Sequence, residues 1–283
     1  MFIISAFADE ISADPREQLA VLTASRVRFI EFRSIHKTNV MKLTDAQLRE
    51  FKAMLDGEGV GISAIGSPIG KYAIDAPFEP QQEMLKKAID LCGQFNTKGI
   101  RVFSGYPPAE KAWDKDWAPY RDEVIRRMKA LTEVAAKAGV TLLHENEHNI
   151  YGDMPERVVD IMGSVNSPAL RSAYDAANWV FCGYDPVKGW DLTKEYTTHL
   201  HIKDWKKPQG EEGHGHGVIA GTGDGHMSYS IKDAVKRGYK GYAVMEPHLR
   251  GGGPTGGVTG ADLFPYAVDA FRKILRDCGG AEG

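Results

Sequence analysis

The stretch Thr141-Leu-Leu-His-Glu-Asn-Glu-His148 joins a short apolar run directly to a series of ionisable residues. The run is too short for a helix and mostly apolar, which is typical of a parallel strand covered on both faces. Seven other segments of the chain have the same length and character. Together, the eight expected strands are Phe2–Ala6, Phe29–Phe32, Gly61–Ala64, Gly99–Phe103, Thr141–His144, Arg171–Tyr174, His199–Ile202 and Gly241–Met245.

Helical patterns separate these expected strands. Thr44-Asp-Ala-Gln47 has the spacing of a capping box, in which two side chains bond exposed amides at a helix start. Val124, Met128 and Leu131 repeat on one face of another expected helix, which Gly139 ends. Further helices are expected at Asp14–Ala24, Phe78–Gln94, from Pro155 onward, and at Asp185–Lys194, Ser230–Arg237 and Leu263–Cys278.

Eight strand–helix units without a linker predict an α/β fold, a single (β/α)8 TIM barrel over residues 1–283. An open doubly wound sheet is the alternative. However, Phe7-Ala-Asp-Glu-Ile11 follows the first strand in place of a glycine-rich phosphate-binding turn. The glycine-rich stretches Gly210–Gly225 and Gly251–Gly260 follow the seventh and eighth strands, where barrel enzymes carry active-site loops.

Charge and cysteine content restrict the class of partner and the compartment. The 35 basic residues are scattered and the net charge is −3, which argues against nucleic acid as a partner. No apolar run approaches the roughly 20 residues of a membrane helix, and the N-terminus lacks a signal-peptide pattern. Cys92, Cys182 and Cys278 form no CxxC motif, which indicates free thiols. We expect a cytoplasmic protein without a membrane partner.

The last four expected strands each end in an ionisable side chain: Glu145, Asp175, His201 and Glu246. In a closed barrel these ends surround one mouth, so the four side chains should converge. Three carboxylates in a low dielectric repel one another, and a cation relieves this repulsion. The donor set suits one divalent ion, Mn²⁺ first, with Mg²⁺, Co²⁺ or Zn²⁺ as alternatives. Otherwise, each acid is a solvated residue that begins a loop.

The sequence resembles the xylose isomerase-like TIM barrels, which include sugar phosphate isomerases and epimerases, endonuclease IV and inosose dehydratase. The resemblance covers essentially the whole chain. Its carriers are Phe7-Ala-Asp-Glu-Ile11, Ile30-Glu-Phe-Arg33, Ala64-Ile-Gly-Ser-Pro-Ile-Gly-Lys71, Ile100-Arg-Val-Phe-Ser104, Glu145-Asn-Glu-His148, Tyr174-Asp-Ala-Ala-Asn178, His199-Leu-His-Ile-Lys-Asp204 and Glu246-Pro-His248.

The resemblance implies that Glu145, Asp175, His201 and Glu246 hold one metal ion. In the ketose 3-epimerase branch, the two glutamates also exchange a carbon-bound proton through an enediolate, next to a carbonyl that the metal polarises. One position departs from that branch: Asn178 stands where those epimerases usually have a histidine. We expect Asn178 to contact the substrate, but this departure puts a transfer of their substrate and mechanism in doubt.

The two-residue period of a strand predicts which way several side chains near the four expected ligands point. Lys203 lies two residues after His201 and should point into the mouth, with an electrophilic or substrate-binding role. His199 should lie one layer deeper, in contact with a ligand or within the core. Glu31 and Arg33, two residues apart, either pair with each other or contact the substrate.

Other polar residues near the expected mouth have weaker signals. His144 should face outward, whereas His148, in the following loop, is a candidate general base or substrate contact. Ser67 and Lys71 could bind a hydroxyl or an anionic group, although their spacing is not a Walker motif. The glycine-rich segment around His214, His216 and His226 favours a mobile loop over a metal site. The aromatic residues after the fourth strand either stack on a sugar ring or pack on a helix; they are Trp113, Trp117 and Tyr106.

Four functions remain open from the sequence. A metal-dependent sugar isomerase or epimerase comes first, and a lyase that removes a hydroxyl or larger group from a keto-sugar or keto-inositol comes second. Endonuclease-like phosphodiester cleavage is disfavoured, because the early strands carry no histidine and the chain is not basic. A non-catalytic sugar-binding barrel is the fourth. If the protein is an isomerase, an epimerase or a lyase, its partner is a small carbohydrate substrate. A homo-oligomer is compatible with these functions.

Overall fold

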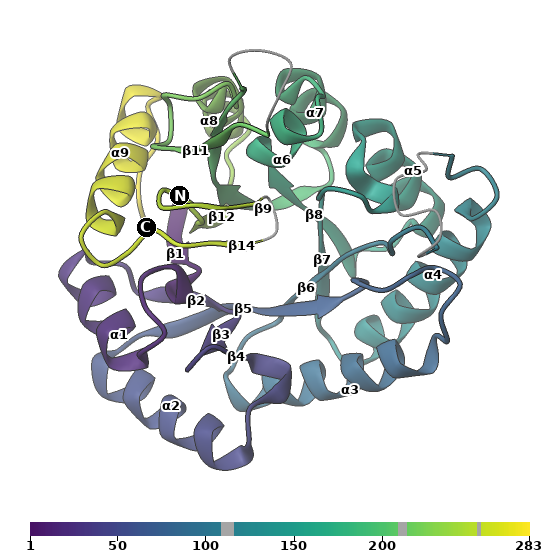
Figure 1. Cartoon of the computed structure of the whole chain (residues 1–283), viewed down its shortest axis with the longest axis horizontal. Coiled ribbons are helices and arrows are strands. Elements are labelled where there is room, and N and C mark those ends of the chain that lie inside the picture. The colour runs from purple at the N-terminus through teal and green to yellow at the C-terminus, as the bar shows by residue number, and fades with distance from the viewer. Residues whose placement is uncertain (109–115, 209–213, 254–255) are drawn as a thin grey trace.

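The computed structural model describes residues 1–108, 116–208, 214–253 and 256–283. Eight parallel strands close into a barrel inside a ring of helices (Figure 1). Each strand pairs with its neighbour along the chain, and the last pairs with the first, which confirms the predicted (β/α)8 barrel. The strands are β1 (Phe2–Ala6), β2 (Phe29–Phe32), β5 (Gly61–Ile69), β6 (Gly99–Val102), β7 (Thr141–Glu145), β8 (Leu170–Asp175), β9 (Thr197–Ile202) and β12 (Gly241–Met245).

The helices bury one apolar face against the barrel. The predicted capping box is confirmed, because the Thr44 hydroxyl accepts from Gln47 N (3.3 Å) and the Gln47 side chain accepts from Thr44 N (3.0 Å). The helices are α1 (Pro15–Ala24), α2 (Asp45–Glu58), α3 (Glu79–Gln94), α4 (Arg121–Lys137), α5 (Pro155–Val165), α6 (Ala176–Phe181), α7 (Pro186–Thr193), α8 (Met227–Lys236) and α9 (Phe264–Asp277), with 3-10 turns at Ala8–Glu10, Val40–Lys42 and Tyr151–Asp153.

Two element boundaries differ from the sequence prediction by three residues or more. Strand β5 continues through Ile69 instead of ending at Ala64, because Phe103 N donates to Ile69 O (2.8 Å) and extends the pairing with β6. Helix α8 begins at Met227, three residues before the predicted start at Ser230. In both cases tertiary contacts override the local pattern, as expected at element ends.

The barrel interior is partly polar, whereas the main apolar core lies between the strands and the helices. Ala64, Leu143 and Ala173 form a small apolar cluster of their own. The hydroxyls of Ser5 and Ser63 meet across the barrel at 2.7 Å. An interior of small and polar side chains leaves room for the ionisable groups that the strands direct inward.

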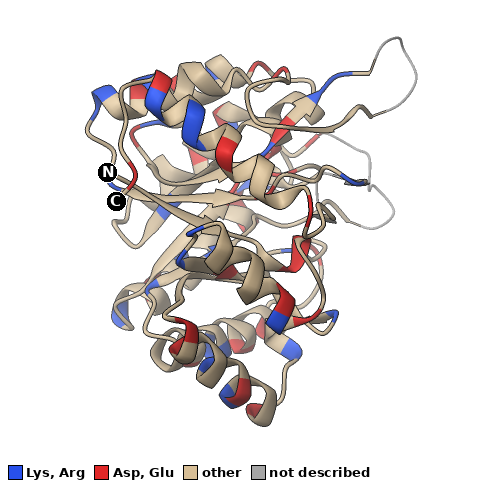
Figure 2. Cartoon of the chain, turned by 90° about the vertical axis from the view of Figure 1, so that its left-hand side faces the viewer, with Lys and Arg blue, Asp and Glu red and all other residues tan. Residues whose placement is uncertain are grey.

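Three short hairpins extend beyond the barrel: β3 (Ser34–Ile35) with β4 (Thr38–Asn39), β10 (Asp204–Lys206) with β11 (His216–Val218), and β13 (Gly252–Gly253) with β14 (Gly256–Gly257). Phe2 N donates to Ala281 O (3.0 Å), which holds the two ends of the chain together. The three cysteines are free. Basic and acidic side chains are interspersed on the helices seen in Figure 2. None of the described helices is long and apolar enough to cross a lipid bilayer.

Gly70 sets the close approach of the loop after β5 to the end of β6. Its φ is +93°, and a Cβ at this position would lie 2.0 Å from the Phe103 carbonyl oxygen. We predict that Gly70→Ala lowers the free energy of unfolding by about 3 kcal/mol or more, since backbone strain and a backbone clash add together. Gly139→Ala is the matched control: Gly139 also has a positive φ (+69°) but open space around it, and should cost about 1 kcal/mol. Equal losses in chemical denaturation would contradict the prediction.

Candidate active site

The strand ends bring the four predicted metal ligands together. Glu145 ends β7, Asp175 ends β8, His201 lies near the end of β9, and Glu246 directly follows β12. Each side chain offers one donor atom within 4.8 Å of the others. All four are buried, with at most 2% of their surface exposed. The expected convergence at one mouth of the barrel is therefore present.

His201 lies at the centre of this cluster. Its Nδ1 is 3.2 Å from Glu145 Oε1 and 3.7 Å from Glu246 Oε2. Its Nε2 faces the opposite way and is 3.3 Å from Glu31 Oε2. The same Glu31 oxygen is 2.7 Å from His199 Nε2. His199 thus lies one layer deeper, as predicted, and shares a carboxylate with His201.

Burial and nearby histidines act in opposite directions on Glu31. Complete burial opposes its ionisation, but the interactions with His201 and His199 outweigh burial and lower the pKa of Glu31. An ionised Glu31 requires N–H donors, so it favours the tautomer in which His201 Nε2 carries a proton. Burial lowers the pKa of His201, but Glu145 and Glu31 outweigh burial and raise it, so Nδ1 also carries a proton in the metal-free protein. Loss of that proton would direct the Nδ1 lone pair toward Glu145 and Glu246.

Lys203 points into the mouth, as its spacing from His201 predicts. Its Nζ lies 2.7 Å from Asp175 Oδ2 and 3.3 Å from Glu246 Oε2, and the side chain is about 1% exposed. Burial raises the pKa of Asp175 to about 6, although Lys203 acts against this shift. The pKa of Lys203 itself is raised, because the carboxylates outweigh its burial.

Arg33 and Glu31 take separate partners. Arg33 Nη1 is 2.8 Å from Glu246 Oε1, and its Nε is 2.8 Å from Asp9 Oδ2. Its guanidinium lies 4.4 Å from the centre of the Phe7 ring. The alternative in which Arg33 simply pairs with Glu31 is therefore wrong, because the closer carboxylates of Asp9 and Glu246 take its charge.

Sequence reasoning did not assign Arg101 a role, although it is an arginine within an apolar strand. Arg101 Nη1 is 3.1 Å from Glu145 Oε2, and its guanidinium lies 4.8 Å from the centre of the Phe7 ring. Arg33 and Arg101 thus share Phe7 as an aromatic neighbour while each bonds one of the two glutamates. The sequence signal for a role at the site was the position of Arg101, a charged residue within a buried strand.

Asn178, for which the sequence predicts a substrate contact, lies against the predicted ligand set. Its Nδ2 donates to Asn146 O (2.8 Å) and is 3.3 Å from Glu145 Oε1. Asn178 N donates to Asp175 Oδ1 (3.0 Å), so Asp175 both caps α6 and enters the cluster. Asn146 fixes the neighbouring strand end by two hydrogen bonds to the Asp175 backbone, of 2.8 and 2.9 Å.

The loop residues occupy different environments. Lys71 Nζ is 2.8 Å from Glu147 Oε2, and burial raises the pKa of Glu147, a carboxyl that sequence reasoning missed. The Ser67 hydroxyl is directed at the backbone and donates to Arg101 O (2.5 Å). The half-buried His148 packs edge-on against Phe181, with ring centres 5.1 Å apart.

A second buried pair, also missed from the sequence, lies beside Glu246. Glu10 Oε1 is 2.6 Å from His248 Nδ1, and Glu10 Oε2 accepts from His248 N (2.9 Å) and from the Thr259 hydroxyl (2.7 Å). Glu10, Glu246 and His248 form a further group with metal-ligand spacing. These bonds tie the loop after β12 to the turn after β1.

The remaining sequence candidates lie away from this cluster. His144 faces outward, as predicted, and is fully buried, so burial lowers its pKa to about 4. Trp117 packs edge-on against Tyr151 (5.5 Å), consistent with a packing role. His214 stacks on Phe181 (5.5 Å). Trp113 lies outside the described residues. Among those described, the potential metal groups contain none of His214, His216 and His226.

The charges around the mouth leave a negative excess. Six carboxylates meet three permanent cations there, and the histidines are shared among the acids. The carboxylates belong to Asp9, Glu10, Glu31, Glu145, Asp175 and Glu246, and the cations to Arg33, Arg101 and Lys203. A divalent cation bound by oxygen and imidazole donors would reduce this excess, so the residues present fit a metal ion.

A closed parallel barrel with a carboxylate and imidazole cluster at the carboxyl ends of its strands defines a TIM barrel whose cluster could hold a metal ion. The family model of the xylose isomerase-like TIM barrels matches residues 23–274, and the chain belongs to this family.

Individual relatives are more distant. A 3-dehydroshikimate dehydratase of Bacillus anthracis is 24% identical over 132 residues, which span 47% of this chain and 46% of that protein. A D-tagatose 3-epimerase-like protein has the same fold, with 14% identity over 98% of both chains and a TM-score of 0.74. A family member from Mycobacterium smegmatis, solved in complex with magnesium, shares 18% identity over 96% of this chain and 97% of its own, with a TM-score of 0.71.

Lys203 compensates buried acids, so its removal should destabilise the metal-free protein. We predict that Lys203→Met lowers the free energy of unfolding at pH 7 by about 3–5 kcal/mol, because a buried charge loses its partner. The pKa of Asp175, already raised to about 6, should rise further. An acid whose pKa is raised in the folded state makes the protein less stable as the pH rises from the unfolded-state pKa to the folded-state pKa. The difference in unfolding free energy between Lys203→Met and the parent protein should therefore shrink as the pH falls from 7 to 5.

The control for this experiment is Lys52→Met, which breaks the exposed Lys52–Asp56 pair (2.9 Å) and should cost less than about 1 kcal/mol at every pH. Denaturant unfolding after chelator treatment measures both variants. If Lys203→Met loses the same unfolding free energy at every pH, Lys203 does not compensate the buried acids.

Proposed function

We propose that this chain is a divalent-metal-dependent isomerase or epimerase of a sugar or sugar derivative. The observation that carries the proposal is the buried convergence of Glu145, Asp175, His201 and Glu246 in a region of negative excess. Mn²⁺ or Mg²⁺ suits three oxygen donors and one nitrogen donor, and Mn²⁺ is our first choice. A magnesium complex of a family member supports such an ion.

Asp175 and His201 serve as ligands whose orientation the protein fixes. The Asn178 backbone N–H holds one oxygen of Asp175, and Glu31 holds the far nitrogen of His201. When bound, the cation would polarise a substrate carbonyl and the adjacent hydroxyl, which favours loss of a proton from the neighbouring carbon.

Glu145 and Glu246 are positioned to move that proton. Burial opposes ionisation of Glu145, but His201 and Arg101 lower its pKa to about 2, so it is available as a base. One glutamate takes the C–H proton while the bonding electrons move to the carbonyl oxygen, which forms an enediolate. The other glutamate can give a proton to the same carbon on the opposite face, which forms the epimer. Alternatively, a proton returns to the adjacent carbon while the hydroxyl proton moves to the first oxygen, which forms the isomer. Proton exchange with solvent then restores the two glutamates. Arg101 and Arg33 hold the two carboxylates during this exchange.

Elimination is the second candidate. The dehydratase relative supports it, and so does Glu147, whose pKa is raised by burial. A carboxyl whose pKa is raised could give a proton to a departing hydroxyl, so that water leaves from the same enediolate. The first proton abstraction is common to both reactions, and only the fate of the intermediate differs.

The metal assignment predicts about one Mn²⁺ or Mg²⁺ per chain after dialysis against the ion. Glu246→Gln should weaken Mn²⁺ binding by more than about tenfold, because it removes a charged ligand. Calorimetric titration and elemental analysis measure this change. The control is Glu156→Gln on the surface of α5, which should bind Mn²⁺ as the parent protein does. If neither protein binds the ion, the site is not a metal centre and a non-catalytic barrel is favoured.

Reaction type is decided by incubating the Mn²⁺-loaded protein with a panel of keto-sugars in D₂O. Isomerisation or epimerisation should place one deuterium on carbon and leave the product otherwise unchanged in mass, whereas elimination should remove water or a larger group. Glu145→Gln and Glu246→Gln should each lower the rate by about 10²–10⁴-fold. Absence of both deuterium incorporation and mass loss across the panel would contradict the proposed proton transfer.

A further inference from the structure

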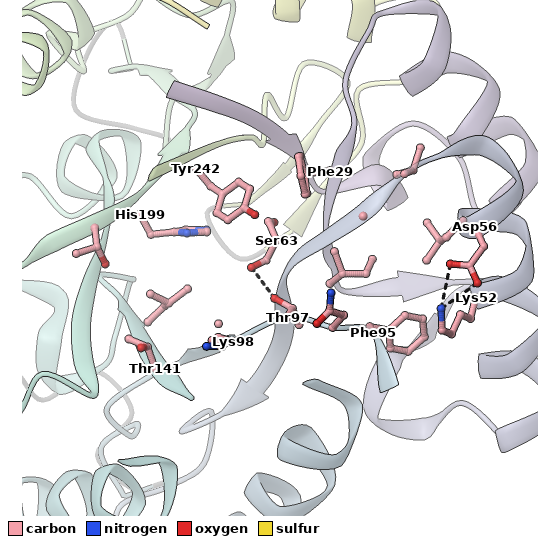
Figure 3. Close-up of a pocket in the computed structure, with 18 residues that line it drawn as sticks. Phe29, Lys52, Asp56, Ser63, Phe95, Thr97, Lys98, Thr141, His199 and Tyr242 are labelled. Carbon is pink, nitrogen blue, oxygen red and sulfur yellow. Dashed lines mark hydrogen bonds and ion pairs between the residues drawn. The ribbon is translucent and has the colours of Figure 1, made fainter. Parts of the chain in front are cut away.

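A cavity lies at the opposite end of the barrel from the metal-ligand cluster. Its volume is about 660 Å³, within the range of small-molecule sites. The first residues of several barrel strands line it, among them Phe29 of β2, Gly61 of β5, Gly99 of β6 and Thr141 of β7 (Figure 3). The cavity therefore belongs to the amino ends of the strands and not to the mouth described above.

One part of the lining is aromatic. Phe29 and Tyr242 meet edge to face, with ring centres 5.2 Å apart, and Figure 3 shows both above the polar groups of Ser63 and Thr141. His199 lies beside Tyr242, with ring centres 6.1 Å apart. Aromatic edges and faces of this kind favour a flat, cyclic ligand body.

The charge of the lining is positive. Lys52 and Asp56 neutralise each other through a 2.9 Å ion pair. Lys98 is exposed at the cavity, and no ion pair joins it to another described residue. The lining thus carries one uncompensated ammonium group, which suits one anionic group on a ligand.

The inner end of the cavity offers a hydrogen-bonding group. His199 lines the cavity and is about 2% exposed. Its Nε2 is 2.7 Å from Glu31 Oε2, which leaves Nδ1 as the ring nitrogen for a ligand. A hydroxyl group on the ligand can either donate to or accept from that nitrogen.

We propose that this cavity is a second small-molecule site, which binds a cyclic monocarboxylate that bears a hydroxyl. The ring lies against Phe29 and Tyr242, the carboxylate faces Lys98, and the hydroxyl faces His199. This inference goes beyond the proposed function and does not depend on it, because none of the lining residues belongs to the proposed metal set.

The probe is 4-hydroxybenzoate, titrated calorimetrically into the chelator-treated full-length protein so that a carboxylate cannot bind a metal ion. We expect saturable binding with a Kd below about 1 mM. The uncharged analogue 4-hydroxybenzamide should bind at least about fivefold more weakly, because it lacks the charge that Lys98 recognises. Equal affinity for the two compounds, or no saturable binding of the acid, overturns the proposal.

Four variants locate the bound probe. Lys98→Met should weaken 4-hydroxybenzoate at least about fivefold, and Lys98→Arg should retain most of the affinity. Lys129→Met changes an exposed lysine of α4 and should leave the Kd unchanged, as should Glu246→Gln at the other end of the barrel. Loss of binding in Glu246→Gln with unchanged binding in Lys98→Met places the probe in the mouth and overturns the proposal, whatever the outcome of the metal experiments.

Discussion

Burial of carboxylates at one end of the barrel is the constraint to which the surrounding structure responds. Glu145, Asp175 and Glu246 have almost no contact with solvent, so each needs a donor or a cation nearby. Arg101 and Lys203 reach them from inside the barrel. Arg101 lies in β6 and Lys203 directly follows β9, so the electrostatic balance requires that the barrel be closed and its register correct.

The same constraint organises the residues behind the cluster. Asn146 and Asn178 join the ends of β7 and β8 to each other and to the acids, while Glu31 orients His201 from the layer below. These groups have little contact with solvent, so the surrounding protein fixes their positions. A proton-transfer site benefits from such support, because small displacements of the reacting groups slow the reaction strongly.

Most of the fold could be predicted from the sequence, because strand length, apolar content and glycine-bounded helices are local properties. The direction of Lys203 followed from the two-residue period of a strand, and the convergence of the four ligands followed from barrel closure. The partners of Arg33 did not follow, since Glu246 lies 213 positions away. The bond between Glu10 and His248, 238 positions apart, was equally invisible, as was the extension of β5 through contacts with β6.

Glu31 has a single oxygen that meets both His199 and His201. Its capacity to accept hydrogen bonds is therefore divided between a residue that lines the cavity at one end of the barrel and a residue of the cluster at the other. A stronger bond to one imidazole leaves less electron density for the other, so the donor strength of His201 depends on what surrounds His199. By thermodynamic linkage, any such influence runs equally in both directions.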